Sequence, residues 1–311
     1  MQIITRLDEL CINEKTALAI GKFDGIHLGH KKLLNLILDQ KQDGLKATVF
    51  TFEPSPEEFF VGHTVRQLFT RDEKRRAFET MGIDILVEFP LTAATAATPP
   101  EDFVRTILVE DLKADYIAAG TDVSFGDKGR GDQYLLKNMS KELGFELCLI
   151  DKVMLDGREV SSTRVRNEVA DGEMPMVKRL LGTEYSVSGI VEHGKHLGHT
   201  LGMPTVNILP PDNKLLPPFG VYRSNVLIDG RTFTGMTNIG RKPTVSSSNQ
   251  VGVETYIYDF DEDVYGKFLE IKLCEFMRPE MKFDSIDELK AQMQKDIGLV
   301  KSTSAASSDI I

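Results

Sequence analysis

Apolar residues change their spacing once along the chain, at about Leu181. Before this point, short apolar runs alternate with segments whose apolar residues recur at the spacing of a helix. Such alternation is typical of a parallel sheet that helices cover on both faces. After it, short strand-like runs punctuated by Gly, Pro and Asp are typical of a compact antiparallel barrel. The sequence of 311 residues therefore predicts an α/β domain over 1–181 and a β-barrel domain over 182–300.

The first domain is predicted from a regular succession of strands and helices. A buried strand ends at Gly21, and glycines also close the helices that precede Gly44 and Gly82. The predicted strands are 16–20, 46–52, 83–89, 116–119 and 146–150, and the predicted helices are 30–42, 71–81, 99–112 and 133–143.

The second domain is predicted from strand-like runs with turn residues between them. Asp229-Gly230 separates two of these runs and predicts a hairpin turn. One helix follows over 286–297, and the Ser- and Ala-rich residues 301–311 are predicted to be disordered. The predicted strands are 185–191, 220–228, 232–238, 251–258 and 268–276.

Charge and cysteine content exclude several classes of function. The net charge of −10 argues against broad electrostatic binding to nucleic acid or to anionic lipid. Cys11, Cys148 and Cys274 lie far apart and form no CxxC pair, so we expect neither disulfides nor a cysteine-based zinc site. No apolar run approaches the ~18 residues of a membrane span, and the N-terminus does not have the composition of a signal peptide. We expect a cytoplasmic protein with small-molecule substrates, and the sequence leaves its oligomeric state open.

A glycine-rich segment, GKFDGIHLGH over 21–30, joins the first predicted strand to its helix. Ligands of open parallel sheets bind at the carboxyl ends of strands, and glycines allow the backbone to approach them closely. The two histidines lie three residues apart at a helix start, where exposed amides and the helix dipole attract phosphate. We interpret the segment as a cradle for a triphosphate, with surface or metal-binding histidines as the alternative. Its candidate site residues are Gly21, Phe23, Asp24, Gly25, His27, Gly29 and His30.

A second phosphate-binding element is predicted over 158–166, REVSSTRVR. Its hydroxyls can cap a helix that starts near Ser162, and its arginines supply fixed positive charge. Such a run on its own would be an ordinary helix start, but it faces the histidine segment across the same predicted sheet. The candidate residues are Arg158, Ser161, Ser162, Thr163 and Arg166.

The barrel domain carries a second candidate site. Glycines recur over 188–202, among them Gly194 and Gly198, and such a run can form a flap over phosphates. Thr205 and Asn207 then share one face of a strand, which suits Mg²⁺ and its nucleotide, although a plain turn and strand is the alternative. Glu254 interrupts an apolar strand, either as a salt-bridge partner or as a base aimed at a substrate hydroxyl.

Together these segments resemble the prokaryotic bifunctional riboflavin kinase/FMN adenylyltransferase family, often called FAD synthetase. The resemblance extends from about residue 15 to residue 297. Several motifs carry it in one order: GKFDGIHLGH (21–30), TFEPSP (51–56), AGTDVSFGDKGRGD (119–132), REVSSTRVR (158–166), GIVEHGKHLGHTLGMPTVN (189–207), PPFGVY (217–222), TNIGRKPT (237–244), VETYIYDFDEDVYG (253–266) and FMRPEMKF (276–283).

The resemblance implies a Rossmann-like adenylyltransferase domain followed by a six-stranded kinase barrel with a C-terminal helix. It implies that ATP and Mg²⁺ are used to convert riboflavin to FMN and FMN to FAD. In the first domain it implies phosphate contacts from His27, His30, Asp122, Arg158, Ser161 and Arg166. In the second it implies that Thr205 and Asn207 hold Mg²⁺ and nucleotide, that Glu254 is the base for the ribityl 5′-hydroxyl, and that Asn238 and Arg278 bind cofactor.

Three residues depart from the usual pattern of this family. Ser55 stands where the family usually has His, His199 where it usually has Arg, and Met203 where it usually has Phe. These departures leave two further hypotheses: an FAD synthetase whose barrel is a weak or inactive kinase, and a flavin-binding regulator without catalysis. The intact candidate residues of both sites argue against the regulator.

Overall fold

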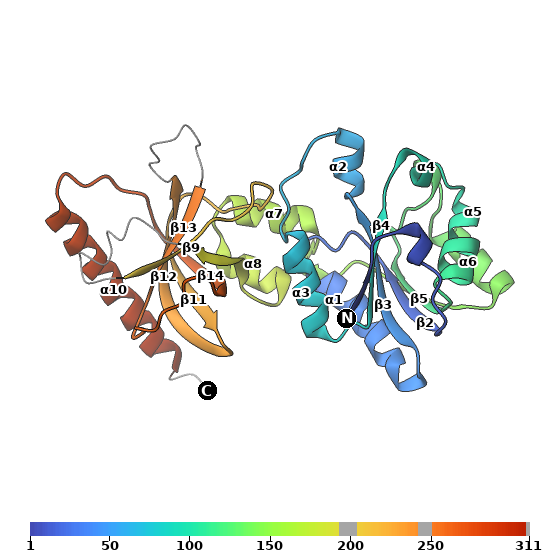
Figure 1. Cartoon of the computed structure of the whole chain (residues 1–311), viewed down its shortest axis with the longest axis horizontal. Coiled ribbons are helices and arrows are strands. Elements are labelled where there is room, and N and C mark those ends of the chain that lie inside the picture. The colour runs from blue at the N-terminus through green and yellow to red at the C-terminus, as the bar shows by residue number, and fades with distance from the viewer. Residues whose placement is uncertain (193–203, 242–250, 309–311) are drawn as a thin grey trace. The chain divides into compact units, whose positions relative to one another are not determined.

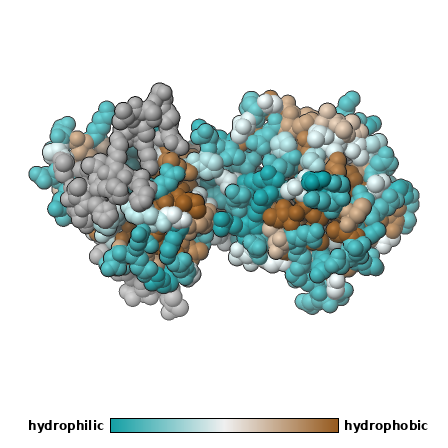
Figure 2. Space-filling view, in the orientation of Figure 1, coloured by the Kyte–Doolittle hydropathy of each residue, from teal (hydrophilic) through white to brown (hydrophobic). Residues whose placement is uncertain are grey.

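The computed structural model describes residues 1–192, 204–241 and 251–308. The chain divides into two compact units, Met1–Val165 and Arg166–Ile311, which Figure 1 draws as an α/β unit and a barrel unit. Among the residues coloured in Figure 2, most on the visible face are hydrophilic, and the hydrophobic residues form smaller patches among these hydrophilic ones. Gly194, Gly198, His199 and Met203 lie outside the described residues.

The first unit is built on a parallel sheet of six strands in the order β1-β4-β3-β2-β5-β6. All residues of β2 are buried, as expected for a parallel strand covered on both faces. Because β3 and β5 flank β2 on opposite sides, the chain reverses its direction of winding here, and ligands bind at such points. The strands are β1 (Gln2–Ile4), β2 (Thr16–Ile20), β3 (Lys46–Glu53), β4 (Ile85–Pro90), β5 (Ala114–Gly120) and β6 (Glu146–Ile150).

Helices cover both faces of this sheet, with α1 and α3 on one side and α5 and α6 on the other in Figure 1. The apolar core beneath them includes Leu18, Phe50 and Ile117, all fully buried. The helical elements are η1 (Leu7–Glu9), α1 (Leu28–Asp39), η2 (Gln40–Asp43), α2 (Pro56–Val61), α3 (Arg71–Met81), α4 (Ala93–Ala96), α5 (Pro100–Asp102), η3 (Phe103–Asp111), η4 (Asp127–Gly129) and α6 (Gln133–Leu143).

Two elements of the first unit differ from the prediction. The helix predicted over 99–112 is a short α-helix, α5, continued by the wider π-type helix η3. No helix is predicted between the strand over 46–52 and the helix over 71–81, yet α2 begins directly after Ser55. Pro56 occupies the first turn, where no backbone N–H is needed. Ser55 caps the helix and forms a reciprocal capping box with Glu58, so this residue stabilises local structure.

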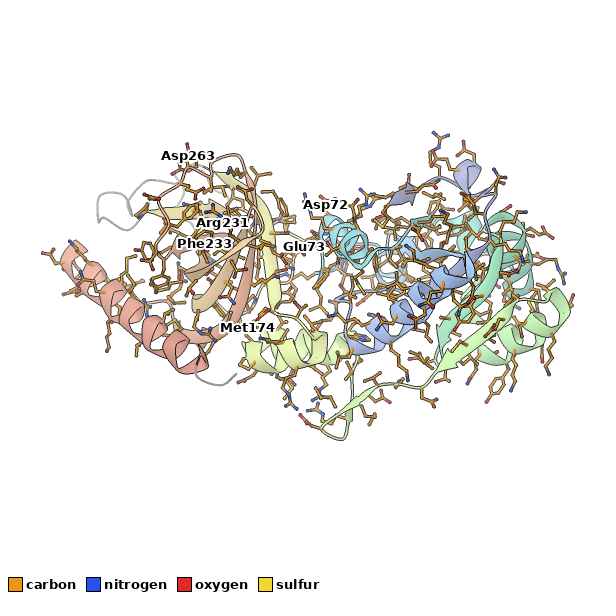
Figure 3. All side chains as sticks on the ribbon, turned by 90° about the horizontal axis from the view of Figure 1, so that it is seen from below. Asp72, Glu73, Met174, Arg231, Phe233 and Asp263 are labelled. Carbon is orange, nitrogen blue, oxygen red and sulfur yellow. The ribbon has the colours of Figure 1, made fainter. Side chains whose placement is uncertain are left out.

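The second unit contains a closed antiparallel barrel in the order β10-β13-β12-β11-β14-β9. The predicted hairpin turn is confirmed, since Asp229 and Gly230 have positive φ angles of 46° and 78° between β11 and β12. Just beyond it the guanidinium of Arg231 lies over the ring of Phe233 (Figure 3), 5.1 Å from the centroid. The strands are β9 (Tyr185–Glu192), β10 (Thr205–Ile208), β11 (Gly220–Ile228), β12 (Arg231–Arg241), β13 (Val251–Ile257) and β14 (Phe268–Pro279).

The second unit also contains helices outside the barrel. The final helix, α10 (Ile286–Ser308), runs past its predicted end at Ile297, so residues 301–308, predicted as a disordered tail, are helical. Along the sequence, β6 is followed by the short strands β7 (Met154–Leu155) and β8 (Arg158–Glu159) and by the helices α7 (Ser162–Ala170) and α8 (Met174–Leu181), which precede β9. α8 packs on β14 and β9, and the domain boundary at Leu181 stays a prediction.

We predict that α8 is needed for a stable isolated barrel. Its residues Met174, Val177, Leu180 and Leu181 are fully buried, and each such side chain contributes roughly 1.5–3 kcal/mol. A fragment of residues 171–308 should therefore unfold at a higher urea concentration than a fragment of residues 182–308. Urea denaturation followed by circular dichroism measures the difference, and equal midpoints would show that α8 does not stabilise the barrel.

Candidate active sites

A cavity of about 710 Å³ opens in the first unit at the carboxyl ends of its central strands. Its lining includes the last residue of β2, the residues after β5 and β6, and the first turns of α1 and α7. The sheet thus brings together segments that are far apart in the sequence. The predicted site residues that line this cavity are Gly21, His27, Gly29, His30, Asp122, Ser161, Ser162 and Thr163.

His27 is the N-terminal cap of α1. Its Nδ1 accepts a hydrogen bond from the backbone N–H of His30 at 3.3 Å. In a neutral imidazole, the other nitrogen then carries the proton, so Nε2–H of His27 remains a donor. The two rings stack with centroids 3.8 Å apart and an interplanar angle of 14°. Both imidazole rings therefore lie together at the start of α1.

Both histidines are neutral at physiological pH. Burial lowers the pKa of His27 to about 4, against a smaller opposing effect of Asp122. Burial, together with the neighbouring His27, also holds the pKa of His30 well below its usual range. Nδ1 of His30 is buried and has no hydrogen-bond partner among the described residues. The pair can therefore donate hydrogen bonds to an anion but brings no positive charge to it.

We predict that the low pKa of His27 makes the first unit less stable in mild acid. An unfolded histidine takes up a proton at about pH 6.5, whereas folded His27 does so only at about pH 4. Between these values the unfolded state binds more protons, so the free energy of unfolding falls as the pH is lowered, by about 2 kcal/mol from pH 7 to pH 5. Urea denaturation of His27→Asn, which keeps a capping side chain but cannot titrate, should show a correspondingly smaller loss. An equal loss in both proteins would contradict the low pKa.

The loop before α1 is shaped by residues that do not line the cavity. Phe23 is fully buried at a φ of 50° and packs its ring edge-on against Phe78 at 5.6 Å. The carboxylate of Asp24 accepts hydrogen bonds from the backbone of residues 68 and 69 at 2.9 and 3.3 Å. Gly25 has a φ of 85°, a backbone conformation that residues other than glycine rarely adopt. These three candidate residues hold the loop in place, and any ligand contact from them stays a prediction.

Gly29 gives the ring of His27 its space. A Cβ atom at this position would lie 3.1 Å from Cε1 of that ring, closer than nearly all real contacts. Substitution of Gly29 would therefore push the imidazole away from the helix cap. The glycine spacing of the motif thus has a local steric reason on this side of the cavity.

The start of α7 forms the opposite wall of the cavity. Oγ of Ser161 accepts a hydrogen bond from the backbone N–H of Arg164 at 3.2 Å, which confirms the predicted cap. Oγ of Ser162 donates to the backbone oxygen of Asp24 at 2.8 Å and so ties this helix to the loop before α1. The buried Arg164, which sequence reasoning missed, donates to the carbonyls of Leu155 and Arg158 and supports the β7–β8 hairpin.

The positive charge around the cavity comes from residues that were not predicted. Arg158, on β8, and Arg166, on α7, are not among the described residues that line it. Lys22, Lys128 and Lys152 line it instead. Lysines on loops carry no distinctive spacing, so only the fold could reveal them.

A second part of the lining is mostly apolar. It comes from the ends of β3 and β4, from α2 and from η3, on the other side of β2 from β6. Phe60 on α2 lines this part of the cavity although 72% of its surface is exposed. The phenylalanine and leucine residues of this part of the lining are Phe52, Phe60, Phe89, Leu91 and Phe103. The cavity therefore has a polar and an apolar half, which suits a phosphate chain beside an aromatic ring system.

In the barrel, one transverse row joins most of the candidate residues. Asn207 of β10 lies directly opposite Glu254 of β13, which lies opposite Asn238 of β12. Directly opposed residues share one face of a sheet. The neighbours of Glu254 along β13, Val253 and Thr255, are fully buried, so the row points out of the barrel. The register therefore places these three candidate residues on one face of the barrel wall.

Glu254 has a partner within this site. The hydroxyl of Thr205 donates a hydrogen bond of 2.6 Å to Oε1 of Glu254. The sequence left open whether Glu254 is a salt-bridge partner or a base. Among the described residues, its partner is the hydroxyl of Thr205 and not a cation. The carboxylate is only partly buried and remains an acceptor.

The row continues across the sheet from Asn238 to Val221 of β11, which lies opposite Asn238, and then to Arg278 of β14, which lies opposite Val221. Its guanidinium pairs with Asp296 of α10, with Nη2 and Oδ2 2.7 Å apart, and Asp296 is 1% exposed. Met236, Tyr256 and Met293 pack nearby between the barrel and α10. Arg278 thus attaches α10 to the barrel beside the row, and its predicted contact with cofactor stays a prediction.

Two negative findings apply to the described part of the chain. No helix in it has both the length and the apolar character needed to cross a membrane. Nor does it hold a cluster of three or more His, Cys, Asp or Glu side chains arranged to bind a metal ion.

Both units match families of known proteins. The family model of FAD synthetase matches residues 10–164, and that of riboflavin kinase matches residues 181–304. The bifunctional riboflavin kinase/FMN adenylyltransferase of Listeria monocytogenes is 34% identical over 90% of this chain and 89% of its own length. The protein of the same name from Haemophilus influenzae is 35% identical over 92% of this chain and 93% of its own length.

A solved structure is similar over nearly the whole chain. It is the crystal structure of a Streptococcus pneumoniae protein described as a macrolide-efflux protein. The two sequences are 26% identical, the TM-score is 0.84, and the match covers 97% of this chain and 99% of that chain. The likeness supports the order of an α/β unit followed by a barrel.

Proposed function

This chain belongs to the bifunctional riboflavin kinase/FMN adenylyltransferase family of FAD biosynthesis, and we propose how its residues divide the two reactions. The barrel unit transfers the γ-phosphoryl group of ATP to riboflavin, and the α/β unit transfers AMP from ATP to FMN. The observation that carries this division is the cavity of the first unit, whose polar half suits a triphosphate and whose apolar half suits a flavin ring.

In the α/β unit, the phosphate chain of ATP lies against the first turns of α1 and α7. Nε2–H of His27 donates to a phosphate oxygen without first taking up a proton, because its pKa is about 4. Exposed amides and the dipole of α1 add a partial positive charge of ~0.5. An FMN phosphate oxygen attacks the α-phosphorus, and pyrophosphate leaves with the electrons of the broken bond. These residues stabilise charge that develops on the phosphates.

In the barrel unit, Glu254 acts as the base. It takes the proton of the ribityl 5′-hydroxyl as that oxygen attacks the γ-phosphorus of ATP, and ADP leaves. The hydrogen bond from Thr205 orients the carboxylate. Asn207 and Asn238, on either side of Glu254, orient nucleotide and substrate from the same face.

Thr205 and Asn207 fit a magnesium ion. Their hydroxyl and amide oxygens are hard donors, which Mg²⁺ prefers, and Mg²⁺ usually takes its remaining ligands from water and substrate phosphates. When bound with ATP, the ion would neutralise phosphate charge near the transferred group. The small number of protein donors is therefore consistent with a metal that arrives with its nucleotide.

The remaining proposals concern the cellular location of the protein and its small-molecule partners. Cys11, Cys148 and Cys274 are free thiols, and we propose a reducing, cytoplasmic location on the basis of this cysteine usage. The partners are small molecules: riboflavin, FMN and ATP.

Separation of flavins over time tests the proposed function. The protein is incubated with riboflavin, ATP and Mg²⁺, and the flavins are resolved by chromatography. FMN should appear first and FAD later. A protein with an inactive kinase barrel would convert only supplied FMN, and a flavin-binding regulator would convert neither substrate.

A further inference from the structure

The polar half of the adenylyltransferase cavity needs more positive charge than its motif residues supply. ATP and pyrophosphate are polyanions, whereas His27 and His30 are neutral at physiological pH. Arg158 and Arg166 lie outside the described lining. The dipole of α1 contributes only about half a charge. A lining cation from another segment would therefore help to neutralise the phosphates, beside any Mg²⁺ that arrives with the nucleotide.

Lys152 is the lining lysine that the structure positions most firmly. It follows β6 directly, and its Nζ lies 2.9 Å from Oε2 of Glu159 and 3.7 Å from Oδ2 of Asp122. Among the three lining lysines, it is the one for which the described residues provide an ion pair. Its side chain is 45% exposed, so its ammonium group is both oriented and accessible.

Asp122 connects this lysine with the histidine pair. It follows β5, which lies between β2 and β6 in the sheet. It lies close enough to His27 to influence the pKa of that ring, and 3.7 Å from Lys152. The end of β5 therefore lies between the histidine pair, which follows β2, and Lys152, which follows β6.

We propose that Lys152 binds the β- and γ-phosphates of ATP and the pyrophosphate that leaves. This inference rests on the adenylyltransferase function proposed above. In the reaction an FMN phosphate oxygen forms a bond to the α-phosphorus. The bond from the α-phosphorus to the α,β-bridging oxygen breaks, and pyrophosphate keeps its electron pair. A fixed ammonium beside the departing group stabilises that charge.

The two carboxylates, Glu159 and Asp122, orient the ammonium group of Lys152. Exposed ion pairs between lysine and a carboxylate are weak, so phosphate oxygens can replace Glu159 and Asp122 as partners. The hydrogen bond and charge of Glu159 also raise the pKa of Lys152 above its ordinary value, which is already well above neutrality. Lys152 therefore enters the reaction as a cation at any pH near neutrality.

The reverse reaction tests this inference most directly. Lys152→Met removes the charge and keeps the aliphatic stem. In the conversion of FAD and pyrophosphate to FMN and ATP, the KM for pyrophosphate should rise by about tenfold or more, since charge-assisted hydrogen bonds are the strong ones. The KM for ATP in the forward reaction should rise as well. Binding of AMP, which lacks both distal phosphates, should stay at the parent value.

Three controls separate binding from folding. Lys152→Arg restores a cation and should recover much of the pyrophosphate affinity. Lys141→Met, on the exposed surface of α6, should behave as the parent. Riboflavin phosphorylation by the barrel unit reports on the integrity of the same preparation.

Two results would overturn the inference. One is a KM for pyrophosphate in Lys152→Met equal to that of the parent. The other is an equal loss of AMP and ATP binding, which would make Lys152 a structural residue. If the parent protein itself forms no FAD from FMN, the proposed function fails instead, and that result is read before any variant is compared.

Discussion

Glu254→Gln should lower the rate of riboflavin phosphorylation by about two to four orders of magnitude, because a positioned base that accepts a proton in the transition state contributes that much. Glutamine keeps the size of the side chain and can still accept the hydrogen bond from Thr205, but it cannot take the proton. Conversion of supplied FMN to FAD should be unchanged, since that reaction belongs to the other unit. Rates of both reactions are measured on one preparation.

A control variant and an ADP-binding measurement show whether a loss of activity in Glu254→Gln comes from the missing base. Glu275→Gln removes an exposed carboxylate from β14 of the same barrel and should leave both rates at their parent values. The affinity for ADP should also be unchanged in Glu254→Gln, because Thr205 and Asn207 are proposed to hold the nucleotide. A kinase rate within a few-fold of the parent would reduce Glu254 to a hydrogen-bond partner of Thr205.

His27→Ala should lower FAD formation from FMN by about two to three orders of magnitude, the usual effect of losing a donor to developing charge. It also removes the cap of α1, which costs about 1 kcal/mol of stability. His27→Asn separates these effects, since asparagine is a good helix cap but lacks the imidazole Nε2–H. Both variants should lose FAD formation, while only the alanine variant should lose the cap stability. FAD formation at the parent rate in His27→Asn would show that the ring only caps the helix.

His30→Ala provides the companion measurement. Its ring stacks on that of His27 and contacts Phe23 at 5.0 Å, so its removal also loosens the first imidazole. We expect a loss of FAD formation of similar size, with FMN formation from riboflavin intact. Equal losses of both activities in a protein still folded by circular dichroism would argue against separate sites.

The sequence predicts elements best where spacing and caps agree. The helix over Gln133–Leu143 and the strand over Gly220–Ile228 match their predicted bounds, because apolar periodicity and turn residues mark both ends. α2 was missed because the prolines around Ser55 indicate a break as readily as a helix start. The π-type helix η3 was missed because its composition is that of an ordinary α-helix.

Long-range contacts explain what could not be predicted at the sites. The register of β10, β13 and β12 places Asn207, Glu254 and Asn238 in one row, and no local spacing encodes that pairing. The partner of Arg278 is Asp296, on a helix that begins after β14 has ended. Lys152 pairs with Glu159 on β8 and with Asp122 after β5, and neither pairing follows from local spacing. Motif residues were therefore identifiable from the sequence, whereas their partners required the fold.

Mixing the two variants tests the central claim that one chain carries two separate active sites. Given riboflavin, ATP and Mg²⁺, Glu254→Gln alone should make almost no FAD because it lacks FMN, and His27→Asn alone should stop at FMN. Combined in one reaction, the intact barrel of the second protein supplies FMN to the intact α/β unit of the first, and FAD formation should be restored. Failure of the mixture to form FAD, when each protein retains its one expected activity, would contradict a division into two independent sites linked by free FMN.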